Sequence, residues 1–160
     1  MRHKLYKKVL SFCLAIMMAV AAFLPSVPTY GASDDALPDK EVVEVSDTST
    51  ILTRGNFLNY GSVMLSKESS TRVLITGITV AHVKCDKLGV GLYLEQSSDG
   101  ANYGNYRHWY FWEANASMFS QTLEVIVPSG YWYRLGGSHV ALEGSDGEST
   151  TTMTKGIYVG

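Results

Sequence analysis

Apolar and polar residues alternate with a period of two along residues 88–95, and this alternation constrains the fold more than any other feature of the sequence. One parity holds Leu88, Val90, Leu92 and Leu94, and the other holds Gly89, Gly91, Tyr93 and Glu95. Successive side chains of a β-strand point to opposite faces, so the four aliphatic side chains share one face. The pattern predicts a strand with that face buried in a core.

Short runs of the same kind recur from residue 51 onward, separated by Gly, Asp, Asn and Ser clusters and without a helical period. Turn signals lie at Ser97–Gly100 and at Pro128–Gly130. The expected strands are 51–58, 62–66, 71–83, 87–96, 105–114, 117–127, 131–140 and 149–159. Short strands at this spacing favour two packed antiparallel sheets, so residues 51–160 are expected to form an all-β antiparallel β-sandwich, immunoglobulin/fibronectin-like or jelly-roll-like.

The segment Val127–Leu135 resembles a corner of fibronectin-type and immunoglobulin-like domains, in which a tyrosine near a strand start bonds back to the preceding turn. Tyr131 or Tyr133 would fill that role. A Cys…Trp…Cys framework is absent from the sequence, so the resemblance extends to the sandwich class and not to true immunoglobulin domains.

The N-terminus carries the three parts of a secretory signal peptide. Basic residues precede an apolar run from Val9 to Leu24 that only Ser11 interrupts, and small residues follow near Gly31 and Ala32. This sixteen-residue segment is shorter than the roughly 20 apolar residues that a helix needs to cross the hydrocarbon core, which argues against the alternative of a retained membrane anchor. We expect residues 1–32 to be cleaved and the chain to be secreted and extracellular, with no membrane contact afterwards.

The remaining chain is acidic at its start and near neutral elsewhere. Without residues 1–32 it holds nine basic and fifteen acidic residues, a net charge of −6, and six of the acids lie in residues 33–50. That composition predicts a disordered acidic leader over 33–50, although Val42, Val43 and Val45 leave an edge strand as the alternative. The domain has no basic cluster to neutralise phosphates, so nucleic acid is not an expected partner.

Few residues point to catalysis or to a metal. The histidines at 82, 108 and 139 fall in separate expected strands, and the sequence has no nucleophile or paired-carboxylate motif. Turn chemistry explains loop acids such as Asp99, with calcium as the alternative. We therefore expect no enzyme activity, no catalytic residue, no metal and no cofactor.

Cys85 is the single cysteine left once Cys13 departs with the signal peptide, so no internal disulfide can form. The sequence leaves two alternatives for Cys85, a buried thiol and a disulfide between chains, and it does not determine the oligomeric state.

Aromatic residues concentrate at 103–112 and 131–133 and supply the candidate binding site. Strand alternation puts one of the pairs Trp109/Phe111 and Tyr110/Trp112 on the outer face. If the tyrosines at 131 and 133 serve the corner, Trp132 and Arg134 face outward as well. Rings and an arginine suit recognition of a glycan, a cell-wall polymer or a protein surface, whereas the alternative is rings that pair across the sheet or lie under a loop. The candidate ligand-binding residues are Tyr110, Trp112, Trp132 and Arg134.

Four motifs carry a family resemblance: Arg54-Gly55, Leu94–Gly100, Pro128–Arg134 and the Thr-rich final strand. With them, residues 51–160 resemble an uncharacterised family of small secreted proteins from Gram-positive bacteria. The resemblance implies export and a compact β fold. Taken together, the sequence predicts a secreted non-catalytic binding module, and the alternative is a structural or self-assembling extracellular protein.

Overall fold

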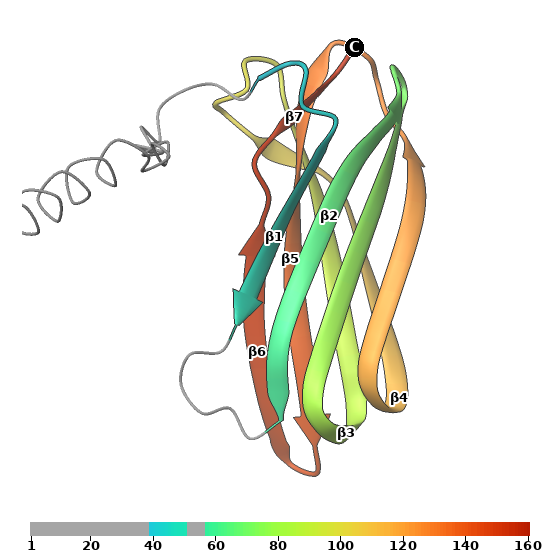
Figure 1. Cartoon of the computed structure of the whole chain (residues 1–160), viewed down its shortest axis with the longest axis vertical. Helices are drawn as coiled ribbons and strands as arrows, with labels where there is room; N and C mark the ends of the chain where they lie inside the picture. Colours follow the sequence, from blue (N-terminus) through green and yellow to red (C-terminus); the bar gives the residue numbers. More distant parts are fainter. Residues whose placement is uncertain (1–38, 51–56) are drawn as a thin grey trace, which may run out of the picture. The chain divides into compact units, whose positions relative to one another are not determined.

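The computed structural model describes residues 39–50 and 57–160, which form seven β-strands and no helix (Figure 1). The strands are β1 (Glu44–Thr50), β2 (Leu58–Ser69), β3 (Arg72–Ser97), β4 (Gly104–Ile126), β5 (Tyr131–Glu143), β6 (Asp146–Met153) and β7 (Ile157–Val159). This confirms the all-β class. A helix long and apolar enough to cross a membrane does not occur among these residues.

The strands form one antiparallel sheet that curls back on itself. Its order is β1-β2-β3-β5-β6, with β4 beside β3 and β7 beside β5. Residues 72–80 of β3 pair with β2 and with the second part of β4, whereas residues 85–97 pair with β5 and with the first part of β4. In Figure 1 both β3 and β4 turn back at the same end of the sheet, and Asn115 takes a φ of 54° in the β4 turn. The sheet therefore has two halves whose inner faces meet.

The main core lies between these inner faces. Leu88, Val90, Leu92 and Leu94 of β3 are all buried, as their alternation predicts. The larger cluster joins residues from both halves of the sheet: Val63, Leu65, Val73, Ile75, Val90, Leu92, Leu94, Val125, Val127, Tyr133, Leu135, Ile157 and Val159. A smaller cluster near the turn of β3 contains Leu58, Ala81, Cys85, Leu88 and Ala141. Cys85 is thus a buried free thiol.

Residues 44–50 form β1, which corrects the expectation of a disordered leader over 33–50 for this part of the segment. All seven residues pair with β2, and Val45 packs against the main core. Side chains also join β1 to β6: Ser49 Oγ lies 2.6 Å from Thr150 Oγ1, and Met153 N–H donates to Asp47 Oδ2 at 2.8 Å. Composition alone could not reveal these partners, because they lie about a hundred residues away.

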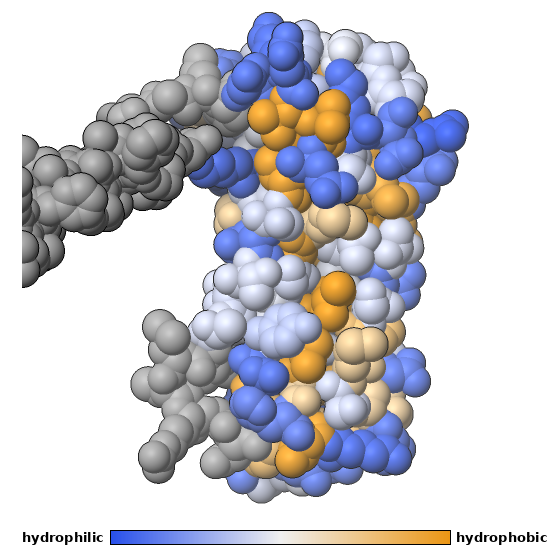
Figure 2. Space-filling model, viewed as in Figure 1, coloured by the Kyte–Doolittle hydropathy of each residue, from blue (hydrophilic) through white to orange (hydrophobic). Residues whose placement is uncertain are grey.

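On the face drawn in Figure 2, polar side chains divide the apolar residues into separate patches.

Several other expected boundaries differ from the structure. Residues 71–83 and 87–96 belong to one strand, β3, because the chain keeps its pairing with β4 on both sides of the turn near Cys85. For the same reason 105–114 and 117–127 are both part of β4, whereas 149–159 divides into β6 and β7. The expected signal peptide over 1–32 and most of the expected strand 51–58 lie outside the described residues.

Tyr133 makes the expected corner. Its hydroxyl donates to the Pro128 carbonyl oxygen at 2.9 Å and accepts from Gln96 Nε2 at 2.7 Å. The side chain is fully buried, whereas Tyr131 is partly exposed. Burial raises the pKa of Tyr133, which keeps its hydroxyl a donor. The corner fixes the turn before β5 and the start of that strand.

Candidate functional site

The first part of β4 divides its rings between the two faces of the sheet. Trp109 and Phe111 are half-buried and pack against the main core. Tyr110 and Trp112 point to the outer face and keep 56% and 52% of their surface exposed. The sequence required one of the two pairs to face outward, and the structure identifies that pair as Tyr110 and Trp112.

The two outward rings lean over glycine backbone in β3. Gly89 pairs with Trp112, and Gly91 pairs with Tyr110. A Cβ atom at Gly89 would lie 2.6 Å from the Trp112 ring, and one at Gly91 would lie 3.1 Å from the Tyr110 ring. The glycines therefore leave the space in which the rings rest, as expected where side chains approach a strand backbone closely.

Four side chains form what we call the aromatic face: Tyr93, His108, Tyr110 and Trp112. Tyr93 meets Tyr110 edge to face with ring centroids 5.6 Å apart, and the His108 ring lies 5.8 Å from that of Tyr110. Interaction with the Tyr110 hydroxyl, followed by partial burial, raises the pKa of Tyr93 to about 12. The Tyr93 hydroxyl is therefore protonated at neutral pH and is available for hydrogen bonding.

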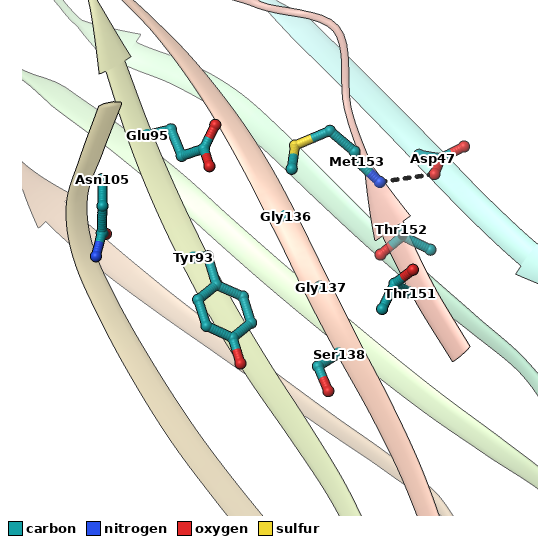
Figure 3. Close-up of a pocket in the computed structure, with 10 residues that line it drawn as sticks. All are labelled: Asp47, Tyr93, Glu95, Asn105, Gly136, Gly137, Ser138, Thr151, Thr152 and Met153. Carbon is teal, nitrogen blue, oxygen red and sulfur yellow. Dashed lines mark hydrogen bonds between the residues drawn. The ribbon is translucent and has the colours of Figure 1, made fainter. Parts of the chain in front are cut away.

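A groove of about 740 Å³ opens beside the aromatic face, and Tyr93 lines both (Figure 3). Gly136 leaves the backbone of β5 bare between Tyr93 on one side and Met153 on the other. The volume is within the range of ordinary ligand sites. Seven of the ten lining residues have polar side chains, and the lining consists of Asp47, Tyr93, Glu95, Asn105, Gly136, Gly137, Ser138, Thr151, Thr152 and Met153.

Trp132 is buried, with only 5% of its surface exposed, which corrects the expectation that it faces solvent. Two neighbours cover it. Its ring lies 5.3 Å from that of Tyr158, and a Cβ atom at Gly100 would lie 3.1 Å from it. The turn after β3 thus closes over Trp132, which matches the alternative of a ring under a loop and separates this residue from the aromatic face.

Arg134 is partly buried and already has partners. Its Nε donates to Glu95 Oε2 at 2.6 Å, and its guanidinium carbon lies 4.4 Å from the centre of the Tyr103 ring. The arginine therefore orders Glu95 at the end of the groove, and it is not an unengaged donor beside exposed rings as the sequence suggested.

Asp99 organises the turn that covers Trp132. Its Oδ1 accepts from the backbone N–H groups of Ala101 and Asn102 at 2.9 and 2.8 Å, and from Ser97 Oγ at 2.7 Å. These bonds hold the pKa of Asp99 well below its ordinary value. Turn chemistry accounts for this acid, as expected from the Asp99-Gly100 pair.

The expected histidines are placed apart from one another. His139 lies in the core, His108 lies on the aromatic face, and His82 is exposed in the middle of β3. Among residues 39–50 and 57–160, no three His, Cys, Asp or Glu side chains are grouped so that they could hold a metal ion.

The sequence interpretation missed the groove residues Glu95, Asn105, Ser138 and Thr151. Each belongs to a different strand, and the pairing of β3 with β4 and β5, together with that of β5 with β6, brings them together. The Gly136-Gly137 pair was the available signal, since adjacent glycines in a strand mark a bare stretch of sheet.

The chain was also compared with known proteins. No curated protein matches it. The model of a family of unknown function, DUF6147, matches residues 33–156. The chain therefore belongs to the DUF6147 family.

Proposed function

We propose that this protein is a secreted, non-catalytic binding module whose ligand is an extracellular polysaccharide, either a glycan or the glycan strand of a cell wall. One observation carries the proposal: the exposed rings of Tyr110 and Trp112 continue through Tyr93 into a groove that is lined by several polar side chains. This combination fits a chain of sugar rings, which present flat C–H faces and hydroxyl groups in alternation.

The exposed rings supply the apolar part of the contact. Each is large and has few rotatable bonds, so ordering it on a ligand costs little conformational entropy. Their edges rest above Gly89 and Gly91, which limits their movement before a ligand arrives. A sugar ring stacked on Trp112 could place the next unit over Tyr110, because the two residues are separated by one residue on the same strand.

The groove supplies the polar part of the contact. Asn105 offers an amide, and Ser138 and Thr151 offer hydroxyl groups that can both donate and accept. Glu95 is held by Arg134 in an ion pair of 2.6 Å, so it supports a role in accepting hydrogen bonds more than a role in proton transfer. This arrangement is the basis for proposing binding without catalysis.

Two further features belong to the proposal. Export rests on the basic and apolar pattern of residues 1–32, and the Gram-positive origin rests on the family resemblance of the sequence. The two facing halves of the curled sheet support the description of the fold as a β-sandwich, with β3 and β4 passing from one layer to the other.

Retention on insoluble polysaccharide tests the proposal. The full chain is expressed, and the purified protein is incubated with chitin, cellulose and purified Gram-positive peptidoglycan. We expect retention on at least one of them, and a loss of about tenfold in affinity for Trp112→Ala and for Tyr110→Ala. Met118→Ala is the matched control, because Met118 is an apolar residue on the second part of β4 that is at least as exposed as Tyr110 and Trp112.

Thermal unfolding of each variant separates lost contact from lost fold, and Trp112→Phe adds a variant that keeps a ring above Gly89. Equal retention of the folded Trp112→Ala and wild-type proteins would overturn the proposal, as would a failure of the wild type to bind any of the three polymers.

A further inference from the structure

The outer edge of β4 is the longest open edge of the sheet in the described part of the chain. The strand has 23 residues and pairs with β3 alone. Of the other outer strands, β7 has only three residues, and β1 and β6 contact each other through side chains, as Asp47 and Thr150 show. An edge of this kind presents unpaired N–H and C=O groups to which another strand can bind.

Proteins usually protect such edges with proline, lysine or an inward-facing charge. The first part of β4, from Gly104 to Ala116, contains neither proline nor lysine. Its charged residues, Arg107 and Glu113, are exposed at the edge but share the parity of Trp109 and Phe111, so they lie on the inner-face side and oppose pairing with a strand that carries no matching charges. Neither forms an ion pair with another described residue, so a strand that sets opposite charges beside them satisfies both. They flank an uninterrupted run of aromatic residues from His108 to Trp112.

This stretch is complementary to itself in the antiparallel direction. When Tyr110 is set opposite Tyr110 of a second copy, Arg107 lies opposite Glu113 and Trp109 lies opposite Phe111. His108 then lies opposite Trp112. Opposite charges and paired rings stabilise directly opposed positions of an antiparallel sheet, and like charges there destabilise it. Twofold symmetry repeats each of these pairs, so the register contains two ion pairs.

We propose that a second copy of this chain docks on the first part of β4, with a twofold axis at Tyr110, and that the two sheets join into one across the dimer. Twofold symmetry is the usual arrangement of homodimers, and the same patch then serves both subunits. Directly opposed residues of an antiparallel pair point to the same side of the sheet, so in this register the aromatic faces of the two copies become one continuous surface. The half-buried rings of Trp109 and Phe111 gain cover from the second copy.

The second part of β4 lacks this complementarity, which is why we assign the dimer contact to the first part. Its one acidic residue, Glu124, already pairs with Arg72 of β3 at 3.1 Å. Its exposed apolar side chains, Met118 and Ile126, lie at its two ends, and mainly polar residues separate them.

Charge reversal tests whether Arg107 of one copy pairs with Glu113 of the other, a contact that cannot form within a single chain. Arg107 and Glu113 are six residues apart, about 20 Å along an extended strand, so they cannot pair within one copy. Arg107→Glu and Glu113→Arg are prepared separately as full-length expressed protein, with Ser120→Arg as the control for a new charge on the second part of β4. Sedimentation velocity over a concentration series gives the dimer dissociation constant of each.

The wild type and Ser120→Arg are expected to dimerise. Each reversal variant alone should dimerise roughly 30-fold more weakly, because two ion pairs become two repulsive pairs. An equimolar mixture of Arg107→Glu and Glu113→Arg should recover the wild-type affinity, because every charge then meets its opposite in the mixed dimer. A wild type that is monomeric at all concentrations, or a mixture that dimerises no better than its components, would overturn the proposal. Circular dichroism confirms that each variant is folded, and the polysaccharide assay is independent, since both variants keep Tyr110 and Trp112.

Discussion

His139 offers a prediction whose size can be worked from the structure. The side chain has no exposed surface and lies between the two halves of the sheet, where a Cβ atom at Gly61 of β2 would overlap its ring. Thr79 Oγ1 donates to the Gly89 carbonyl at 2.9 Å, so it accepts from His139 Nδ1 at 3.1 Å. Thr152 Oγ1 lies 2.9 Å from Nε2 and donates to it. The site therefore holds a neutral imidazole with both nitrogens satisfied.

Protonating this ring costs free energy because it charges a buried group. Burial lowers the pKa of His139 from 6.5 to about 4, and a backbone hydrogen bond and the charge of Asp47 oppose that change only in part. The unfolded chain thus binds a proton at higher pH than the folded protein. The contribution of neutral His139 to the free energy of unfolding is therefore fully present above pH about 6.5 and is lost as the pH falls towards about 4. The total loss is about 3 kcal/mol, at about 1.36 kcal/mol for each pKa unit.

Urea unfolding at intervals between pH 7 and pH 4 measures this loss. His139→Gln removes the titrating ring and should abolish most of the loss over that range, although the variant is less stable at pH 7. His108→Gln, at an exposed position, is the matched control and should keep the wild-type dependence on pH. The loop carboxylate Asp99 contributes at lower pH, because its pKa is lowered from an ordinary value of 3.8. An unchanged pH dependence in His139→Gln would refute the assignment.

Two further predictions concern the core. Tyr133→Phe removes the hydroxyl that joins Pro128 to Gln96, so the free energy of unfolding should fall by about 1–2 kcal/mol. Tyr131→Phe is the control and should change this free energy little. Equal free energies of unfolding for the two variants in urea would contradict the assignment of the corner to Tyr133. Cys85 should react with iodoacetamide only when the protein unfolds, because burial and then the neighbouring acids raise its thiol pKa, and rapid alkylation of the folded protein would show that the thiol is accessible.

The sequence predicts local features of this protein better than its long-range contacts. The burial of Leu88 to Leu94 follows from a period of two within one strand, and the role of Tyr133 follows from the turn just before it. Both depend on residues close together in the chain. The continuity of β3 through Cys85 was not predictable in this way, because a turn inside a paired strand has the same polar residues as a loop.

The candidate site shows the same division. The outward pair Tyr110 and Trp112 was among the two choices that alternation allows, but the covering of Trp132 depends on Tyr158 and Gly100, which approach it only in the fold. Likewise, Arg134 meets Glu95 through the register of β3 with β5. Such contacts require the pairing of distant strands, which a single sequence does not reveal.

The indole N–H resonances of the protein test the central claim, that the aromatic face binds sugar rings. Trp112 is exposed, Trp109 is half-buried and Trp132 is buried, so the three indoles report on three environments. A ¹⁵N-labelled sample is titrated with chitooligosaccharides, cellooligosaccharides and soluble peptidoglycan fragments, and each indole is assigned by substitution. We predict that at least one of these ligands shifts the Trp112 resonance in a saturable manner while the Trp132 resonance stays in place. A Trp112 resonance that none of them moves would contradict the account.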